Sequence, residues 1–123
     1  MEKFDLETPC LVLDLDILED NLGRMQAGAT AAGKNLRPHA KSHKCSALAR
    51  RQLQNGAIGI CAAKVSEAEV LVNNGVHGVL VTGPVASEQK AARLVKLLGI
   101  SPSLMTVVDH ADSIKLLDRL LAD

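Results

Sequence analysis

The sequence predicts an α/β fold built around a parallel β-sheet. Five apolar segments of strand length alternate along the chain with five segments whose apolar residues recur at helical spacing. The strand segments are almost continuously apolar, which is typical of parallel strands covered on both faces. Connections of only a few residues join neighbouring segments, so a single domain is expected over the 123 residues.

Two architectures fit this alternation. One is a complete doubly wound sheet, and the other is the first part of a (β/α)8 barrel, which takes about 250 residues in full. A dinucleotide-binding doubly wound sheet carries a glycine-rich turn after its first strand, whereas Leu15 to Asp20 contain no glycine. The sequence therefore favours a partial barrel.

The first elements are predicted from apolar runs and the residues at their boundaries. Residues 9–15 form an apolar strand, and Asp16 with Glu19 three positions later has the spacing of a capping box at the start of a helix. That helix is expected to end near Gly33. A second strand is predicted over residues 36–41.

The middle of the chain repeats this strand and helix order. The helix after the second strand is expected to end at Asn55, which glycine follows. Residues 58–64 read as the next strand. Ser66 and Glu69 have the spacing of a second capping box, for a helix over residues 67–73.

The last third adds two more pairs of strand and helix. Residues 78–82 form a short apolar strand, and Ser87 can cap a helix that runs through Leu98. Residues 104–108 form the fifth strand, and residues 109–112 begin the last helix. With the first strand and helix set apart, this order gives about four βα units.

Composition excludes several classes of function. The 14 Lys and Arg residues balance 14 Asp and Glu residues, so no basic field exists for nucleic acid or an anionic membrane. Phe4 is the only aromatic residue, and Cys10, Cys45 and Cys61 form no CxxC pair, so we expect free thiols and no structural zinc site. No signal-peptide core is seen, and no apolar run approaches the roughly 20 residues of a membrane helix, so a cytoplasmic protein is expected.

The residues with the richest chemistry lie in one run from Arg37 to Lys44, which reads Arg-Pro-His-Ala-Lys-Ser-His-Lys. If this strand is extended, Arg37, His39 and Lys41 share one face, because side chains alternate between faces. Three cationic or titratable groups on one face repel one another and favour an anionic partner. Neighbouring positive charge also biases a lysine toward its neutral, nucleophilic form.

Three blocks of the sequence resemble a known enzyme family. They are Thr-Pro-Cys-Leu-Val-Leu-Asp-Leu-Asp over residues 8–16, Leu-Arg-Pro-His-Ala-Lys-Ser-His-Lys over residues 36–44, and the run over residues 59–69. The family is that of pyridoxal-phosphate enzymes with an alanine-racemase-like barrel, in the D-threonine aldolase and D-serine dehydratase branch. The second block is its most specific motif.

The resemblance implies roles for the motif residues. Lys41 would form the Schiff base with pyridoxal 5'-phosphate, with Lys44, expected one turn into the next helix, as the rival. Arg37 and His39 would contact the cofactor ring or phosphate, or instead form an internal network in the barrel floor. Thr82 ends its strand in a position that could also face the site. His39 and His43 lie across a strand end, so no metal site is expected from them.

The resemblance also implies an α/β fold of the alanine racemase N-terminal type, with a partial (β/α)8 TIM barrel over residues 1–123 and no second domain. The strand at residues 9–15 would belong to a β-domain completed elsewhere, and residues 36–41 would be the first barrel strand. The implied function is a lyase of β-hydroxy D-amino acids, resembling D-threonine aldolase, with a divalent metal (Mn or Zn) whose ligands lie outside this chain. A D-serine dehydratase-like deaminase, a non-catalytic cofactor carrier and an inert fragment are the alternatives, and a homodimer is expected at full length.

Overall fold

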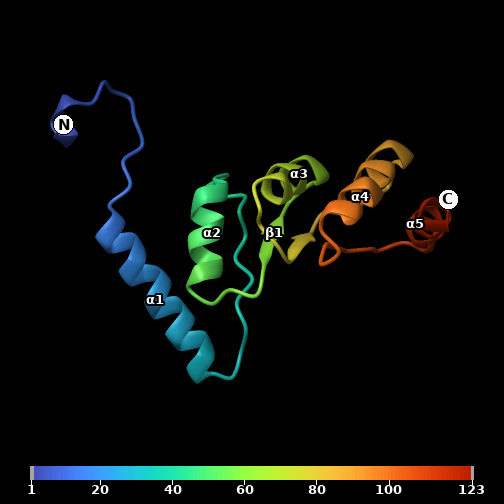
Figure 1. Cartoon of the computed structure of the whole chain (residues 1–123), viewed down its shortest axis with the longest axis horizontal. Coiled ribbons are helices and arrows are strands. Elements are labelled where there is room, and N and C mark those ends of the chain that lie inside the picture. Colours follow the sequence, from blue (N-terminus) through green and yellow to red (C-terminus); the bar gives the residue numbers. More distant parts are fainter. Residues whose placement is uncertain (1, 123) are drawn as a thin grey trace.

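The computed structural model describes residues 2–122 of the chain (Figure 1). In chain order its elements are the 3-10 helix η1 (Lys3–Asp5), α1 (Leu15–Ala31), α2 (Ser46–Gln54), β1 (Ile60–Ala62), α3 (Val65–Asn73), β2 (Val79–Val81), α4 (Glu88–Ile100), β3 (Met105–Thr106) and α5 (Ala111–Ala122). The predicted alternation of strands and helices is confirmed from α2 onward. Five α-helices are present in the described part, but only three regular strands.

The three strands form one parallel sheet in the order β1-β2-β3. The predicted strand at residues 36–41 extends this sheet without meeting the definition of a regular strand. It makes one parallel bridge, between His39 and Cys61, and flanking backbone hydrogen bonds join it to the β1 region. The N–H of Cys61 donates to the Pro38 carbonyl at 2.7 Å, and the N–H of Ala40 donates to the Cys61 carbonyl at 2.9 Å. Four parallel segments therefore lie side by side.

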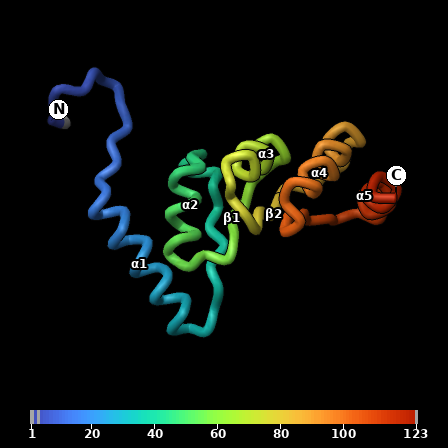
Figure 2. The backbone as a smooth tube through the Cα atoms, in the orientation of Figure 1, coloured from blue at the N-terminus to red at the C-terminus, as the bar shows by residue number. Residues whose placement is uncertain are grey.

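The predicted strand at residues 9–15 is wrong for this structure. Residues 9–14 have no regular secondary structure, and Leu11, Val12 and Leu13 are exposed. An isolated strand leaves its backbone groups and apolar side chains in water, and no described segment pairs with this one. Figure 2 shows this part of the chain leading to α1 at one flank of the molecule, apart from α2 to α5.

The N-cap of the helix after this segment lies two residues earlier than predicted. The side chain of Asp14 accepts hydrogen bonds from the backbone N–H groups of Asp16 and Ile17, so Asp14 and not Asp16 is the N-cap of α1. This 17-residue helix contains no buried residue. None of the helices within residues 2–122 has the length and apolar character needed to cross a bilayer.

The hydrophobic core lies on one face of the sheet. Ile60, Ala62, Val79 and Val81 are all fully buried there, and they pack against apolar residues of α2, α3 and α4. The side chains between them in β1 and β2 point to the other face and are only half-buried. The expectation that both faces would be covered is therefore not met within the described residues.

Helix boundaries follow local hydrogen bonding more than the expected cap spacings. The predicted cap Ser87 is confirmed, because its hydroxyl accepts the N–H of Lys90 at the start of α4. The predicted end of α2 at Asn55 is also confirmed. The second capping box is wrong, because α3 begins at Val65 with Lys64 as its N-cap and Glu69 pairs with Arg93 of α4 instead.

Candidate functional site

The predicted site residues lie along residues 36–45, beside β1 and at the edge of the sheet opposite β3. Arg37 and His39 both reach across β1 to residues that flank β2. They therefore share one face of the sheet, the half-buried face, as the alternation predicted for these two residues. The third predicted member of this face, Lys41, lies beyond the extended segment in a turn. Their contacts separate them along the strands, with Arg37 near the beginning of β2 and His39 near its end.

Arg37 occupies the end of the sheet where the strands begin. Its guanidinium donates a hydrogen bond to the backbone carbonyl of Gly78, which precedes β2. The Arg37 guanidinium and neighbouring backbone atoms lie close to the positions that Cβ atoms of Gly59 and Gly78 would occupy. A Cβ at Gly59 would overlap Arg37 and the Gly78 carbonyl. This geometry corresponds to the internal floor network that the sequence offered for Arg37. Burial raises the pKa of the neighbouring Cys61 thiol, against the weaker opposite effect of the Arg37 charge.

His39 connects the carboxyl ends of three neighbouring segments. The backbone N–H of Lys41 donates to its Nδ1 at 3.2 Å, and its Nε2 lies 3.2 Å from the hydroxyl of Thr82. That hydroxyl donates to the carbonyl of Ala62 at 3.1 Å, so it accepts from His39. Together these bonds select the neutral ring with its proton on Nε2. Thr82 thus lies beside His39, directly after β2.

Lys41 lies in a tight turn directly after the bridge to β1. The turn is closed by the N–H of Lys44, which donates to the carbonyl of Ala40 at 2.7 Å. Ala40 is buried, whereas Lys41 is exposed. Among residues 2–122, its ammonium has neither a hydrogen-bond acceptor nor an acidic partner. The turn therefore presents a free primary amine where the first parallel segment ends.

Lys44 has a different environment from the one predicted. It lies before α2, whose N-cap is Cys45, and not one turn into that helix. Its backbone has a φ of 48°, in the left-handed region that non-glycine residues rarely adopt. Its Nζ donates to Oε1 of Glu67 at 2.9 Å, beside a pocket of about 120 Å³ between α2 and α3.

Glu67 is the residue of this region that the sequence did not single out. It lies in the first turn of α3, and its second oxygen, Oε2, accepts the backbone N–H of Ala63 at 2.9 Å. The hydrogen bonds from Lys44 and Ala63 hold the pKa of this carboxyl below its ordinary value. An acid in the first turn of a helix was a usable signal, but the spacing of Ser66 and Glu69 pointed to the wrong carboxylate.

His43 completes the turn with an unsatisfied polar atom. Its Nδ1 accepts the backbone N–H of Cys45 at 3.1 Å. Its Nε2 is buried and has no hydrogen-bond partner in the described structure. A buried ring nitrogen of this kind is costly unless a water or a ligand atom satisfies it. No cluster of three or more potential metal-ligating side chains exists within residues 2–122.

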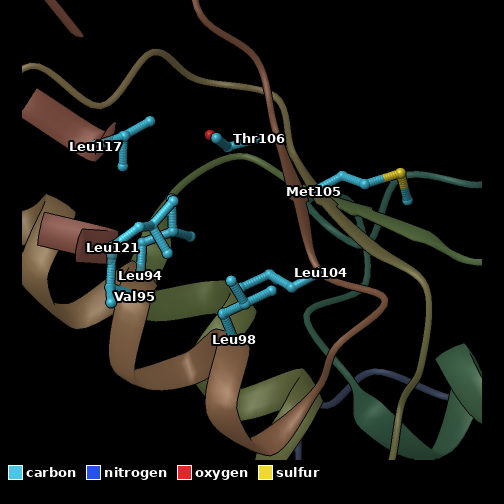
Figure 3. Close-up of a pocket in the computed structure, with 8 residues that line it drawn as sticks. All are labelled: Leu94, Val95, Leu98, Leu104, Met105, Thr106, Leu117 and Leu121. Atoms are coloured by element: carbon cyan, nitrogen blue, oxygen red, sulfur yellow. The ribbon is translucent and has the colours of Figure 1, made fainter. Parts of the chain in front are cut away.

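A separate apolar pocket lies at the opposite flank of the molecule. Its volume is about 100 Å³, and it is lined by Leu94, Val95 and Leu98 of α4, Leu117 and Leu121 of α5, Leu104, and Met105 and Thr106 of β3. Figure 3 shows the leucine side chains on one side of the β3 backbone and the Met105 side chain on the other. Its lining contains no titratable side chain. It therefore has no group suited to acid–base or nucleophilic chemistry, and the candidate site remains the turn at residues 40–44.

Known proteins similar to this chain are enzymes of D-amino acid chemistry. The chain is 38% identical over 115 residues to 3-hydroxy-D-aspartate aldolase of Paracoccus denitrificans, which is 93% of this chain and 30% of that protein. The crystal structure of D-threonine aldolase from Filomicrobium marinum matches with a TM-score of 0.92 and 42% identity, over 96% of this chain and 32% of that one. A mutant of D-threo-3-hydroxyaspartate dehydratase in the metal-free form matches with a TM-score of 0.84 and 31% identity, over 93% and 30%.

These matches define what the chain shares with its relatives. The chain spans about a third or less of the length of each of them. The match to the solved structures includes the partial barrel, with its parallel sheet and covering helices. The family model described as alanine racemase, N-terminal domain, matches residues 13–122, which include the whole candidate site. The chain therefore belongs to the alanine racemase N-terminal domain family.

Proposed function

We propose that this chain is part of a pyridoxal-phosphate-dependent lyase that acts on β-hydroxy D-amino acids, with D-threonine aldolase-like cleavage to glycine and an aldehyde. The observation that carries this proposal is the exposed, unpaired amine of Lys41 in a fixed turn at the carboxyl end of a parallel segment. Active sites of (β/α)8 barrels lie at this end of the strands. Relatives named as aldolases of D-threonine and 3-hydroxy-D-aspartate support the substrate class.

The residues of the site fit such a cofactor chemically. An aldehyde requires a free primary amine, and Lys41 has no carboxylate partner in the described chain to hold its amine. Phosphate and phenolate oxygens require donors, and the buried Nε2 of His43 lacks an acceptor. When bound, pyridoxal phosphate supplies an electron sink for the bond broken at the α-carbon of the amino acid.

The remaining side chains have supporting roles in this proposal. His39 accepts the backbone N–H of Lys41 and so fixes the turn that carries the amine, and contact of its ring with the cofactor remains a prediction. Arg37 holds the other end of the same face through Gly78, and a direct cofactor contact by Arg37 remains a prediction. The divalent metal would be bound by residues outside this chain, in keeping with a relative described in a metal-free form.

Dehydration is the second candidate reaction. The structural match to D-threo-3-hydroxyaspartate dehydratase favours it. Cleavage breaks the Cα–Cβ bond and removes the β-hydroxyl proton, whereas dehydration removes the α-proton and then hydroxide from Cβ. The two reactions therefore release different products from one class of substrate. A cytoplasmic homodimer of the full-length protein is part of the same proposal.

Cofactor binding by lysine variants tests the proposal. We expect pyridoxal phosphate to give the visible absorbance of a lysine adduct with the unmodified chain and with Lys44→Ala, and no such absorbance with Lys41→Ala. Equal binding by Lys41→Ala would contradict the proposed role of Lys41. With Mn²⁺ or Zn²⁺ added, glycine and acetaldehyde from D-threonine indicate the aldolase, and pyruvate from D-serine indicates the dehydratase.

A further inference from the structure

We propose that Glu67 is a positioning residue that selects between the two lysines of the turn, holding the Lys44 amine in an ion pair so that Lys41 alone is free to react. The inference rests on the proposed function, because its consequence is the choice of the lysine that binds the cofactor. The ion pair itself belongs to this chain and can be tested without any cofactor.

The contacts of Glu67 join the two loops that follow neighbouring parallel segments. One oxygen accepts Lys44 Nζ at 2.9 Å, in the turn after residues 36–41, and the other accepts the N–H of Ala63 at 2.9 Å, directly after β1. The Glu67 side chain is 17% exposed and sits at the start of a nine-residue helix. Its position is therefore fixed independently of Lys44, and the flexible partner is the lysine.

The turn gives the two lysines opposite surroundings although they are three residues apart. Lys44 adopts a left-handed backbone conformation at φ 48°, and its amine meets a carboxylate beside the pocket between α2 and α3. Lys41 meets no carboxylate among the described residues. An amine that is hydrogen-bonded to a carboxylate must leave this partner before it can attack an aldehyde. Glu67 therefore suppresses the rival lysine and leaves Lys41 unaffected.

The same contact also fixes the shape of the turn. The turn is closed at the backbone by the bond from Lys44 to Ala40 and at the side chain by the bond from Lys44 to Glu67. Both hydrogen bonds are made by Lys44, and Lys41 lies in the turn between Ala40 and Lys44. Loss of the side-chain closure is expected to free Lys44 first, because its side chain is 65% exposed.

Mapping of amine reactivity tests the ion pair without cofactor. Brief acetylation of the folded chain, followed by peptide mapping, gives the rate at Lys44 relative to the exposed Lys90 of α4. We expect Glu67→Gln to raise this relative rate about five-fold, the size typical of losing a largely exposed ion pair. Glu69→Gln is the matched control, because Glu69 lies on the same helix and pairs with Arg93 instead, and it should leave Lys44 unchanged.

Salt dependence provides a readout that a purely structural role would not change. Because salt screens exposed charges, added NaCl should raise the relative rate at Lys44 in the unmodified chain and in Glu69→Gln but not in Glu67→Gln. This series also carries the test if Glu67→Gln fails to fold. A Lys44 rate that is insensitive to both salt and Glu67→Gln would overturn the inference.

Reductive labelling then tests the choice of lysine. Condensation of a neutral amine with the aldehyde of pyridoxal phosphate releases water, and borohydride reduces the resulting carbon–nitrogen double bond to a stable amine. We expect Glu67→Gln to raise the ratio of labelled Lys44 to labelled Lys41 about five-fold. Lys41 labelling with an unchanged ratio would overturn the selection by Glu67 and leave the proposed function standing. No labelling in any variant would overturn the proposed function and the selection together.

Discussion

The two ends of the same parallel sheet are built in different ways. Where the strands begin, Arg37, Gly59 and Gly78 pack so closely that backbone atoms and the guanidinium leave no room for a side chain at Gly59. Where the strands end, His39, Thr82 and Glu67 connect the loops through side-chain hydrogen bonds, and Lys41 stays exposed. The first end is stabilised by close packing, and the second end by polar contacts that each contribute little to stability.

This difference separates the part of the molecule that maintains the fold from the part that can perform chemistry. Close packing tolerates no added atom, so changes at the first end should affect stability strongly. Hydrogen bonds between half-exposed groups contribute about 1 kcal/mol each, so changes at the second end should leave the fold intact while altering the turn.

The largest effect is expected for Gly59→Ala. A methyl group there would overlap the backbone carbonyl of Gly78 and the Arg37 side chain, and relieving this overlap requires the strands to move. We expect a loss of more than about 3 kcal/mol in the free energy of unfolding, measured by urea denaturation. Gly23→Ala is the control, because Gly23 lies in α1 with open space around it and should be neutral or stabilising. Similar losses of unfolding free energy in the two variants would contradict close packing at the end of the sheet where the strands begin.

The covered face of the sheet should respond nearly as strongly. Ile60 is fully buried between the sheet and its helices, and Ile60→Ala should cost about 3 kcal/mol because it leaves a cavity. Ile100 at the end of α4 is 64% exposed, so Ile100→Ala should change the thermal unfolding midpoint little. A small effect of Ile60→Ala would show that the helices do not pack on this face as described.

At the carboxyl ends of the strands, Thr82→Val should cost only about 1 kcal/mol. The substitution removes the hydroxyl that links His39 to the Ala62 carbonyl. We also expect it to change the nitrogen chemical shifts of the His39 ring in NMR spectra, because Nε2–H loses its acceptor. Thr106→Val is the matched control, and it should leave those shifts as they are. Unchanged His39 shifts in Thr82→Val would refute the selected tautomer.

The smallest effect is the contribution of Glu67 to the pH dependence of stability. Because the pKa of Glu67 is lower in the folded chain than its ordinary value of 4.5, its contribution is present above that value and is lost as pH falls through the folded pKa. The stability difference between the unmodified chain and Glu67→Gln should be below about 1 kcal/mol at neutral pH, given the exposure of Lys44, and should vanish in acid. In a Lys44→Met background the neutral-pH difference should shrink, and an unchanged difference there would exclude Lys44 as the cause.

Local signals in the sequence predicted the order of elements and the motif, but not the contacts between distant residues. The end of α2 at Asn55 and the cap of α4 at Ser87 depend on neighbours within a few residues, and both are confirmed. The strand at residues 9–15 depends on a partner segment that the described chain does not contain. Asp16 and Ser66 had capping-box spacings, but Asp14 caps α1 and no side chain caps α3. The bond from Lys44 to Glu67 joins residues 23 positions apart, which no local pattern encodes.

The role of Lys41 is tested most directly by mapping the lysine that binds the cofactor. The chain is incubated with pyridoxal phosphate, reduced with borohydride and digested, and the modified peptide is sequenced by mass spectrometry. We expect the label on Lys41, whose amine is free, and much less modification of Lys44, which is paired with Glu67. A label on Lys44 in place of Lys41 would show that Lys41 is not the lysine that binds the cofactor.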